Sequence, residues 1–393
     1  MVICWNKSIC LLLLVFGDRG RTLCVAFTSC CIALNKPLDS GFLSSQKLFL
    51  LLVFLQSKAD YSLFIKNDGT YLTILFIYVD AILITGNNIE SIKALKQFLY
   101  TRFLIKDLGD LKFFLGIEIA RSKKGIYISQ RKYDLKIIKD SGYLGAKPVE
   151  FPMEECRLSD KEELLKNPCA YQRLVGRLIY LTITKPDITY SVHILSRFMH
   201  EPRQPHMATA FQVVHYLKSA PGQGLLLHSN NPLHLRAFCD SDWVGCPITC
   251  RSTTRYCVFL GNSLISWRTK RQKTVSLSSV EAEYIAMTGT CCVLTWLRYL
   301  LTDLHMPVSD PITLFCDNQD ALHIVKNHVF HERTRHIEMD CHFIRDKILQ
   351  GEVVTRYVIS SQQLVDVFTK ALGKEKFKQL ICKLGVIDIH SPT

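Results

Sequence analysis

Four acidic residues in the last part of the chain stand where separate elements could bring their side chains together. Asp240 and Asp317 each end an apolar run typical of a strand, whereas Glu283 and Asp366 lie in helical patterns. Converging carboxylates repel one another unless divalent cations neutralise them, and oxygen-only ligands favour Mg²⁺ or Mn²⁺. Two such ions would suit phosphodiester hydrolysis. A single acid is more often a solvated surface group or a helix cap, so order and placement alone leave the metal site open.

A fifth acid, Asp80, lies at the tip of a predicted hairpin. The β-branched and aromatic run of residues 73–79 and the apolar run of residues 82–84 flank it, and Ala81 is its neighbour. Taken alone, this tip is compatible with a working acidic site, a site that has lost a carboxylate, or an ordinary turn.

Two basic clusters are candidates for contact with a polyanion. The first follows Trp267 and comprises Arg268, Lys270, Arg271 and Lys273. It could follow a phosphate backbone or be a solvated turn, and the sequence leaves both open. The second comprises His328, His331, Arg333, Arg335 and His336. Its spacing fits no common zinc site, so substrate contacts or a local hydrogen-bond network are favoured for it.

The elements that must position these residues fall into three groups. The first group has strands at 60–65, 71–79, 113–120 and 125–128 and helices at 89–103 and 129–140. A proline-rich linker at 147–167 leads to helices at 171–184, 188–200 and 206–218. After a break at 221–224 come strands at 233–239, 256–260, 264–267, 312–316 and 353–359 and helices at 278–289, 319–326, 339–350 and 360–372. The last group predicts a mixed sheet with helices on its faces.

Composition narrows the classes of protein. A chain of 393 residues predicts two or three domains, and 48% hydrophobic with 21% charged residues is typical of a globular protein. The net charge of +13 favours nucleic acid first and a membrane surface second, with a merely solvated basic surface as the alternative. The 16 cysteines show no CxxC spacing, so we expect buried thiols in a reducing compartment instead of zinc sites or disulfides.

Residues 232–384 resemble the ribonuclease H domain of copia-type LTR retrotransposon Pol polyproteins. The segments AFCDSDW, SLSSVEAEYIA, LFCDNQDAL and QQLVDVFTKAL carry this resemblance. By position, it implies that Asp240, Glu283, Asp317 and Asp366 bind two Mg²⁺ (or Mn²⁺) ions. It also implies cleavage of the RNA strand of an RNA–DNA hybrid that leaves 5′-phosphate and 3′-hydroxyl ends. Glu281 is expected to be solvated, and Asp242 is expected just past the strand end, outside the ligand set.

The resemblance continues upstream, into the reverse transcriptase of the same family. The segment TILFIYVDAILITGN resembles the palm hairpin, whose tip in the family is Tyr-Val-Asp-Asp. Here Ala81 replaces the second aspartate, and no upstream strand with the third is found in residues 1–55. A palm site needs a carboxylate trio to hold its ions. The expectation is therefore a polymerase remnant that cannot synthesise DNA, with Asp80 left as a polar turn residue.

The resulting domain plan is α/β and α+β, a partial palm, thumb and connection followed by a ribonuclease H-like mixed five-stranded sheet with flanking helices. Its boundaries are an unassigned segment at 1–56, the palm remnant at 57–150, a thumb- and connection-like helical region at 151–231, the ribonuclease H-like domain at 232–384 and a tail at 385–393.

Two departures from the family and several alternatives accompany this plan. Arg255 stands where the family usually has glycine and is expected to crowd the turn, and Ser241 stands where it often has alanine. The chain could instead be a catalytically silent nucleic-acid-binding remnant, or a gene fragment without a stable product.

The apolar run at 8–16 is too short to span a bilayer, and the run at 48–55 is expected to be buried. We expect an intracellular protein, in cytoplasm or nucleus, without a membrane partner. A signal peptide remains the alternative, and the sequence does not fix the oligomeric state.

Overall fold

The computed structural model describes residues 28–34, 53–78, 81–103, 105–154, 158, 162–246, 248–326 and 338–389, with the backbone alone for 28–34 and for Glu338. Six residues singled out from the sequence lie outside the described residues, as does the apolar run at 8–16: Asp80, His328, His331, Arg333, Arg335 and His336. Of the run at 48–55, only residues 53–55 are described. There Phe54 is buried whereas Val53 and Leu55 are exposed, so the expectation of a wholly buried run is wrong.

The first sheet has six strands in the order β2-β3-β4-β5-β1-β6. They are β1 (Thr28–Leu34), β2 (Leu55–Gln56), β3 (Leu63–Asn67), β4 (Leu72–Tyr78), β5 (Ala81–Gly86) and β6 (Ile105–Asp110), with helix α3 (Ile89–Arg102) against one face. Successive strand side chains point to opposite faces. Leu75 therefore packs in the cluster with Leu95 and Leu99 of α3, whereas Ile74 and Phe76 face the main core.

The second sheet joins segments that are far apart in the sequence, in the order β16-β10-β9-β8-β7. Its strands are β7 (Phe113–Phe114), β8 (Ile117–Ser122), β9 (Gly125–Ser129), β10 (Gln223–His228) and β16 (Val386–Asp388). Beside it lie α4 (Arg131–Asp140), α5 (Pro168–Leu181), η1 (Pro186–Ile188), α6 (Thr189–Ser196) and α7 (Gln204–Ser219). The last two residues of the predicted break at 221–224 thus begin strand β10 of this sheet, and the expected tail supplies an edge strand paired with β10.

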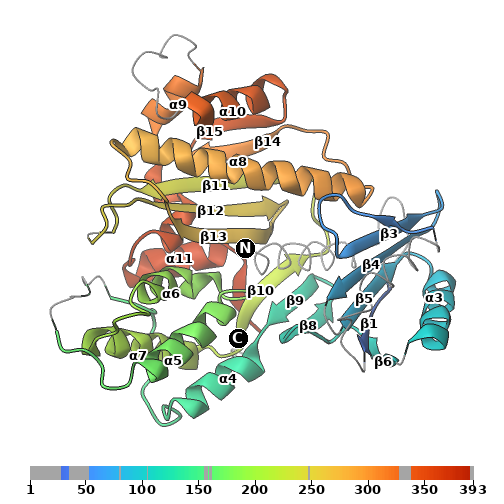
Figure 1. Ribbon diagram of the computed structural model, residues 1–393, viewed down its shortest axis with the longest axis horizontal. Helices are drawn as coiled ribbons and strands as arrows, with labels where there is room; N and C mark the ends of the chain where they lie inside the picture. Colours follow the sequence, from blue (N-terminus) through green and yellow to red (C-terminus); the bar gives the residue numbers. More distant parts are fainter. Residues whose placement is uncertain are drawn as a thin grey trace.

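The third sheet has the order β13-β12-β11-β14-β15. Strands β11 (Leu235–Asp242), β12 (Thr253–Leu260) and β13 (Ser263–Arg271) are antiparallel, and β14 (Ile312–Cys316) and β15 (Val353–Tyr357) run parallel to β11. Its helices are α8 (Ser279–Asp303), α9 (Gln319–Lys326), α10 (Glu338–Leu349), η4 (Ser360–Gln362), η5 (Leu364–Phe368) and α11 (Lys374–Lys383). The expected mixed five-stranded sheet with flanking helices is confirmed (Figure 1).

Two helical predictions differ clearly from the structure. Helix α8 continues to Asp303, because residues such as Leu294, Leu297 and Leu301 keep an apolar face buried beyond residue 289. It is long and apolar enough to cross a membrane, yet half of its most apolar window is buried inside the protein. The single helix predicted at 360–372 is two short 3₁₀ segments, η4 and η5, and helix α11 follows them.

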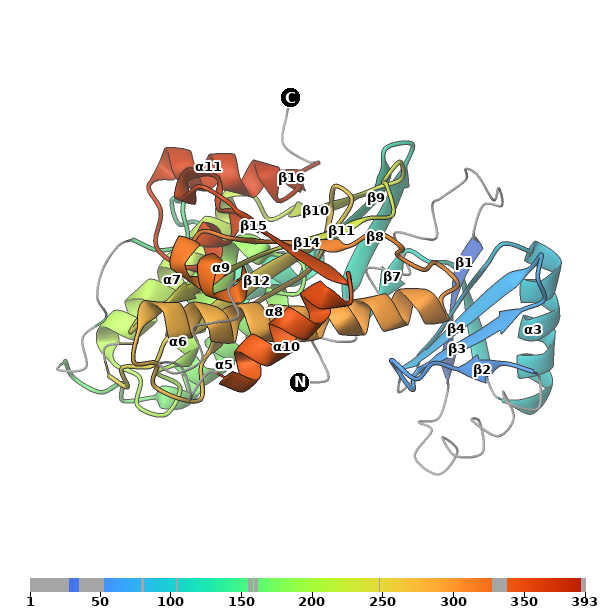
Figure 2. The same cartoon turned by 90° about the horizontal axis from the view of Figure 1, so that it is seen from above.

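The end of α8 meets the first sheet. Asp303 accepts hydrogen bonds from Ser57 Oγ at 2.6 Å and from the backbone N–H groups of Lys58 and Ala59 at 3.1 and 3.4 Å. The indole N–H of Trp296 donates to the carbonyl of Ala59 at 3.0 Å. Figure 2 shows α8 reaching from the third sheet to this contact. We call these four hydrogen bonds the α8 joint.

The ten cysteines whose side chains the structure describes are free thiols. Six are buried, namely Cys239, Cys246, Cys257, Cys291, Cys316 and Cys341. For this part of the chain, the expectation of buried apolar thiols therefore holds for most of the cysteines and for all of those on the third sheet's central strands.

Candidate metal centre and nucleic-acid interface

Three of the predicted acids come together at one edge of the third sheet. Strands β11 and β14 are parallel neighbours, so Asp240 near the end of β11 lies close to Asp317, which directly follows β14. Glu283, in the second turn of α8, faces them. One carboxylate oxygen of each residue lies within 4.8 Å of the others. We call Asp240, Glu283 and Asp317 the acidic trio.

The trio is held by backbone and side-chain contacts in a poorly solvated place. Glu283 is 5% exposed; its Oε1 accepts from Ser241 N–H at 3.0 Å, and Cys316 Sγ lies 3.7 Å from its Oε2. Burial raises the pKa of Glu283 well above its usual value, and Cys316, Asp240 and Asp317 raise it further. Burial also raises the pKa of Asp240, an effect that Arg255 opposes. The trio therefore holds negative charge at an energetic cost.

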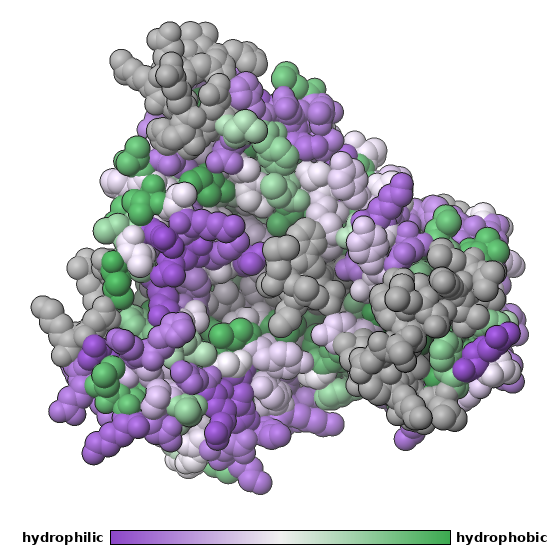
Figure 3. Space-filling view, in the orientation of Figure 1, coloured by the Kyte–Doolittle hydropathy of each residue, from purple (hydrophilic) through white to green (hydrophobic). Residues whose placement is uncertain are grey.

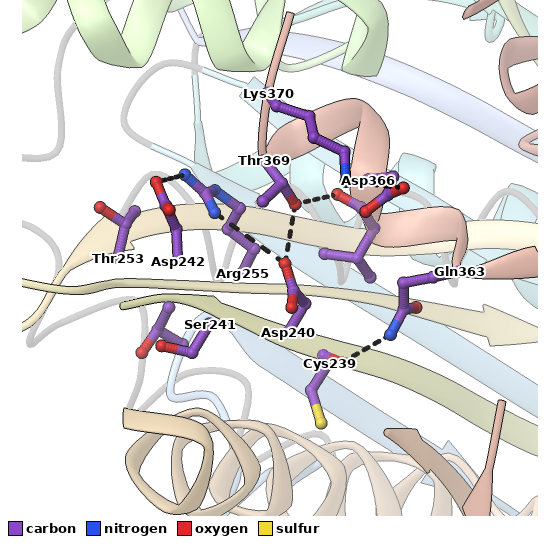
Figure 4. Close-up of polar contacts among 12 residues, drawn as sticks. Cys239, Asp240, Ser241, Asp242, Thr253, Arg255, Gln363, Asp366, Thr369 and Lys370 are labelled. Carbon is purple, nitrogen blue, oxygen red and sulfur yellow. Dashed lines mark hydrogen bonds and ion pairs between the residues drawn. The ribbon is translucent and has the colours of Figure 1, made fainter. Parts of the chain in front are cut away.

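Asp366, the fourth predicted ligand, lies on η5 and outside the trio. It is buried, and its Oδ2 lies 2.6 Å from Lys376 Nζ and 3.2 Å from Lys370 Nζ. The same segment contacts Asp240 by another route, because Thr369 Oγ1 donates to Asp240 Oδ2 at 2.9 Å. Gln363 Nε2 also donates to the carbonyl of Cys239 at 3.0 Å, which ties η5 to β11 (Figure 4).

Arg255 is fully buried beside the trio, opposite Asp240 in the β11–β12 register. Its Nη2 contacts Asp242 Oδ2 at 3.1 Å and its Nη1 lies 4.0 Å from Asp240 Oδ2. Figure 4 shows the guanidinium between these two carboxylates. Arg255 thus lies within the sheet, and Asp242 lies within β11 and not past its end. To predict this pairing from the sequence, the register between β11 and β12 would have to be known.

Glu281 is buried, so the expectation that it is solvated is wrong. Ser278 caps α8 and accepts from Glu281 N–H at 3.1 Å, while Glu281 Oε2 accepts from Leu277 N–H at 2.6 Å. The Ser-x-x-Glu spacing of a capping box was the signal for this role.

The predicted hairpin of the first sheet is present up to its tip. Strands β4 and β5 are antiparallel, with Tyr78 opposite Ala81, and Asp80 lies between them outside the described residues. On its other side β5 pairs with β1, where Ala33 is opposite Ala81. Residues 1–55 therefore do supply a strand beside the hairpin, which the sequence did not predict. That strand, TSCCIAL, contains no acidic residue.

The first basic cluster lies mainly on an edge strand and not in a turn. Arg268, Lys270 and Arg271 belong to β13, the edge of the third sheet, and Lys273 follows it. Burial lowers the pKa of Lys270, and the nearby charges of Arg268 and Lys273 lower it further, so these cations lie close together. Figure 3 shows hydrophilic side chains gathered over the part of this face where β13 ends. Trp267 is buried and donates to the carbonyl of Thr182 instead of facing outward.

The C-terminal end of α6 adds one cationic group that the sequence did not single out, Arg197, and a histidine, His193, that stays neutral. Arg197 donates to the carbonyl of Gly245 at 3.3 Å and to Thr253 Oγ1 at 3.2 Å. Burial lowers the pKa of His193 to about 3, and the charges of Arg197, Arg255 and Arg271 contribute to that shift. Positive charge therefore extends from β13 across to α6, next to the acidic trio's end of the sheet.

Comparison with known proteins identifies the relatives of this chain. Residues 43–155 match the reverse transcriptase (RNA-dependent DNA polymerase) family. The chain is 40% identical over 347 residues to the retrovirus-related Pol polyprotein from transposon RE2 of Arabidopsis thaliana, an alignment that covers 87% of this chain and 24% of that protein. It is 43% identical to an uncharacterized mitochondrial protein of the same plant, over 56% of this chain and 93% of that protein.

Among solved structures, the foamy viral protease-reverse transcriptase in complex with RNA/DNA hybrid is similar, with a TM-score of 0.49 and 13% identity over 92% of this chain and 47% of that one. The chain spans about a quarter of the length of the transposon polyproteins that it matches. The chain belongs to the family of copia-type retrotransposon Pol polyproteins and carries part of their reverse transcriptase region.

Proposed function

We propose that this chain hydrolyses the RNA strand of RNA–DNA hybrids in a Mg²⁺-dependent reaction at the acidic trio. The observation that carries the proposal is the approach of three carboxylates, two of them buried, to within 4.8 Å. Their donors are all oxygen, the set that Mg²⁺ and Mn²⁺ prefer. The raised pKa values of Glu283 and Asp240 support the same reading, since a bound cation would offset the burial and the mutual repulsion that raise them.

The residues around the trio have separate tasks in this proposal. Asp240, Glu283 and Asp317 would hold Mg²⁺, which supplies Lewis-acid stabilisation of the charge that develops on the phosphate oxygens. Ser241 N–H fixes Glu283 and Thr369 fixes Asp240, so two of the carboxylates are oriented before any ion arrives. The cations of β13 would bind the phosphate backbone of the substrate along the sheet edge.

Loss of DNA synthesis is the second part of the proposal. A palm centre needs several carboxylates from neighbouring strands to hold its ions. Ala81 stands beside Asp80 at the hairpin tip, and the neighbouring strand β1 offers Ala33 in register with Ala81. The two alanines at these positions support the proposal that the polymerase region no longer synthesises DNA and has only a structural role.

Cleavage of a labelled RNA–DNA hybrid by the full chain tests the reaction. We expect cleavage in Mg²⁺ or Mn²⁺ and none in EDTA, and we expect Asp240→Asn to abolish it. Asp310→Asn is the matched control, because Asp310 is an exposed acid at the start of the same β14 region. An intact hybrid after incubation with folded wild-type protein and either ion would refute the proposal.

A catalytically silent hybrid-binding protein is the second candidate, favoured by the clustered cations of β13. Binding that weakens with salt, is unchanged by Asp240→Asn and occurs without cleavage would select it over hydrolysis. Gel-shift titration at several salt concentrations, with the same hybrid, makes the distinction.

A further inference from the structure

We infer that this chain binds a single divalent ion, at the acidic trio, and that fixed side-chain cations take the place of a second ion between Asp240 and Asp366. The inference rests on the metal site of the proposed function and departs from the two-ion arrangement implied by the family resemblance. It assigns Arg255, Lys370 and Lys376 a role in setting the number of ions.

Asp366 already has its counter-charges. Its Oδ2 contacts the ammonium groups of both Lys376 and Lys370, at 2.6 and 3.2 Å. An ion that used this oxygen would have to displace both. Asp366 also stands apart from the trio, whose three ligand atoms meet within 4.8 Å without it.

The side of Asp240 that faces η5 is occupied as well. Its Oδ2 accepts the hydroxyl of Thr369 at 2.9 Å and lies 4.0 Å from Arg255 Nη1. Arg255 is anchored by its 3.1 Å contact with Asp242 and cannot lose its proton in a protein. Its Nε and Nη1 have no hydrogen-bond acceptor among the described residues, so the guanidinium keeps charge directed toward Asp240. A second cation here would meet a fixed positive charge at close range.

The trio differs from this neighbourhood in having no ammonium or guanidinium contact to Glu283 or Asp317 within the described residues. The contacts found there are Ser241 N–H and Cys316 Sγ to Glu283 and Ser360 Oγ to Asp317, at 3.0, 3.7 and 3.3 Å. One side of Asp240 thus faces uncompensated carboxylates, and the other faces a guanidinium. A single ion bound on the carboxylate side would neutralise these carboxylates without approaching the guanidinium.

Counting bound Mn²⁺ tests the inference without relying on activity. Full-length protein is titrated with Mn²⁺ while the free ion is followed by electron paramagnetic resonance, and calorimetry gives the affinities. We expect one Mn²⁺ per chain for the wild type. We expect Arg255→Gly to bind a second Mn²⁺ ion, because the fixed guanidinium is removed. The affinity of Arg255→Gly for this second ion should be at least about tenfold higher than that of the wild type.

A second variant keeps the test decisive if Arg255→Gly fails to fold. Lys370→Gln with Lys376→Gln frees Asp366, and we expect it to gain the second ion too. Lys378→Gln is the matched control on the same helix, since Lys378 contacts Glu150 and not Asp366; it should bind one ion. Two ions in the wild type, none, or one in every folded variant would each overturn the inference.

Hybrid cleavage measured on the same preparations separates this inference from the proposed function. One bound Mn²⁺ without cleavage contradicts the reaction and supports the single-ion site. Two bound ions with cleavage support the reaction and contradict the single-ion site.

Discussion

Neutralising Asp317 should make the metal-free protein more stable. Asp317 is the least buried member of the acidic trio, and Asp317→Asn keeps its size and its ability to accept from Ser360. The substitution removes charge from a place where three carboxylates lie within 4.8 Å. A surface acid replaced in the same way has no such effect, so the gain is specific to the trio.

The size of the gain follows from Coulomb's law. Two full charges 4.8 Å apart repel by about 3.5 kcal/mol at an effective dielectric constant of about 20. Asp317 has two such partners, but burial raises the pKa of Glu283, so this carboxylate carries less charge at a given pH than a solvated one and contributes less to the repulsion. Partial exposure of Asp317 further weakens its remaining interaction with Asp240. We therefore expect Asp317→Asn to raise the free energy of unfolding by about 1–2 kcal/mol.

The gain should depend on pH in a defined direction. In the folded state the pKa values of Asp240 and Glu283 lie above their ordinary values of 3.8 and 4.5. Between the ordinary and the raised pKa of each group, the folded state therefore binds more protons than the unfolded state. Wild-type repulsion is therefore complete above the raised values and disappears as the pH falls. The difference between variant and wild type should therefore shrink as the pH is lowered from 7.5.

Thermal unfolding in EDTA measures this. For a domain of this size, about 1–2 kcal/mol corresponds to an increase of about 2–8 °C in the unfolding midpoint. Adding Mn²⁺ should stabilise the wild type and have a smaller effect on Asp317→Asn, which has lost one ligand. Asp310→Asn is the control and should melt like the wild type. An unchanged or lower midpoint for Asp317→Asn in EDTA at pH 7.5 would refute the reasoning.

Three further predictions use other parts of the chain. Ala81→Asp should not produce primer extension on an RNA template, because strand β1 still lacks an acid; any extension above background would contradict this. Lys270→Gln should weaken hybrid binding and reduce the slope of log Kobs against log salt by about 1, whereas Lys93→Gln on α3 should leave both unchanged, as gel-shift titrations would show. Lys185→Met should destabilise the protein by about 3–5 kcal/mol at pH 8, because Asp134 loses its buried partner, and by less at pH 6, below the Asp134 pKa of about 7. Denaturant unfolding at the two pH values measures it, and an equal loss at both would count against that cause.

The local pattern of the sequence predicts most elements of the third sheet. The strand at 312–316 and the helix at 319–326 have the predicted bounds, because apolar periodicity and local propensity agree there. The strand ending at Asp242 was predicted too short, because its last residues are polar and are kept in the strand by pairing with Thr253 and Thr254. Strand β1 was missed for a related reason, since only distant partners hold it in the sheet.

The sequence predicts which acids come together better than it predicts their surroundings. Asp240, Glu283 and Asp317 meet because they sit at strand ends and on a facing helix, which periodicity can reveal. The positions of Asp366 and Arg255 depend on contacts that periodicity does not report: a 3₁₀ turn in place of a helix, two lysines of a later segment, and a cross-strand register. The sequence therefore predicts the clustered negative charge of the acidic trio, but it does not predict which lysine and arginine side chains lie beside that charge.

The α8 joint connects the segment between β2 and β3 with the helix that carries Glu283. Glu283 near one end of α8 belongs to the acidic trio, and Asp303 at the other end is held by residues of the first sheet. The helix between them spans about 30 Å, at about 1.5 Å per residue, as one rigid rod. An aspartate at a helix C-terminus is unfavourable without donors, and Ser57, Lys58 and Ala59 supply them. Residues 57–59 therefore act as a buttress for the far end of the helix that carries Glu283, whatever the strands beside them do.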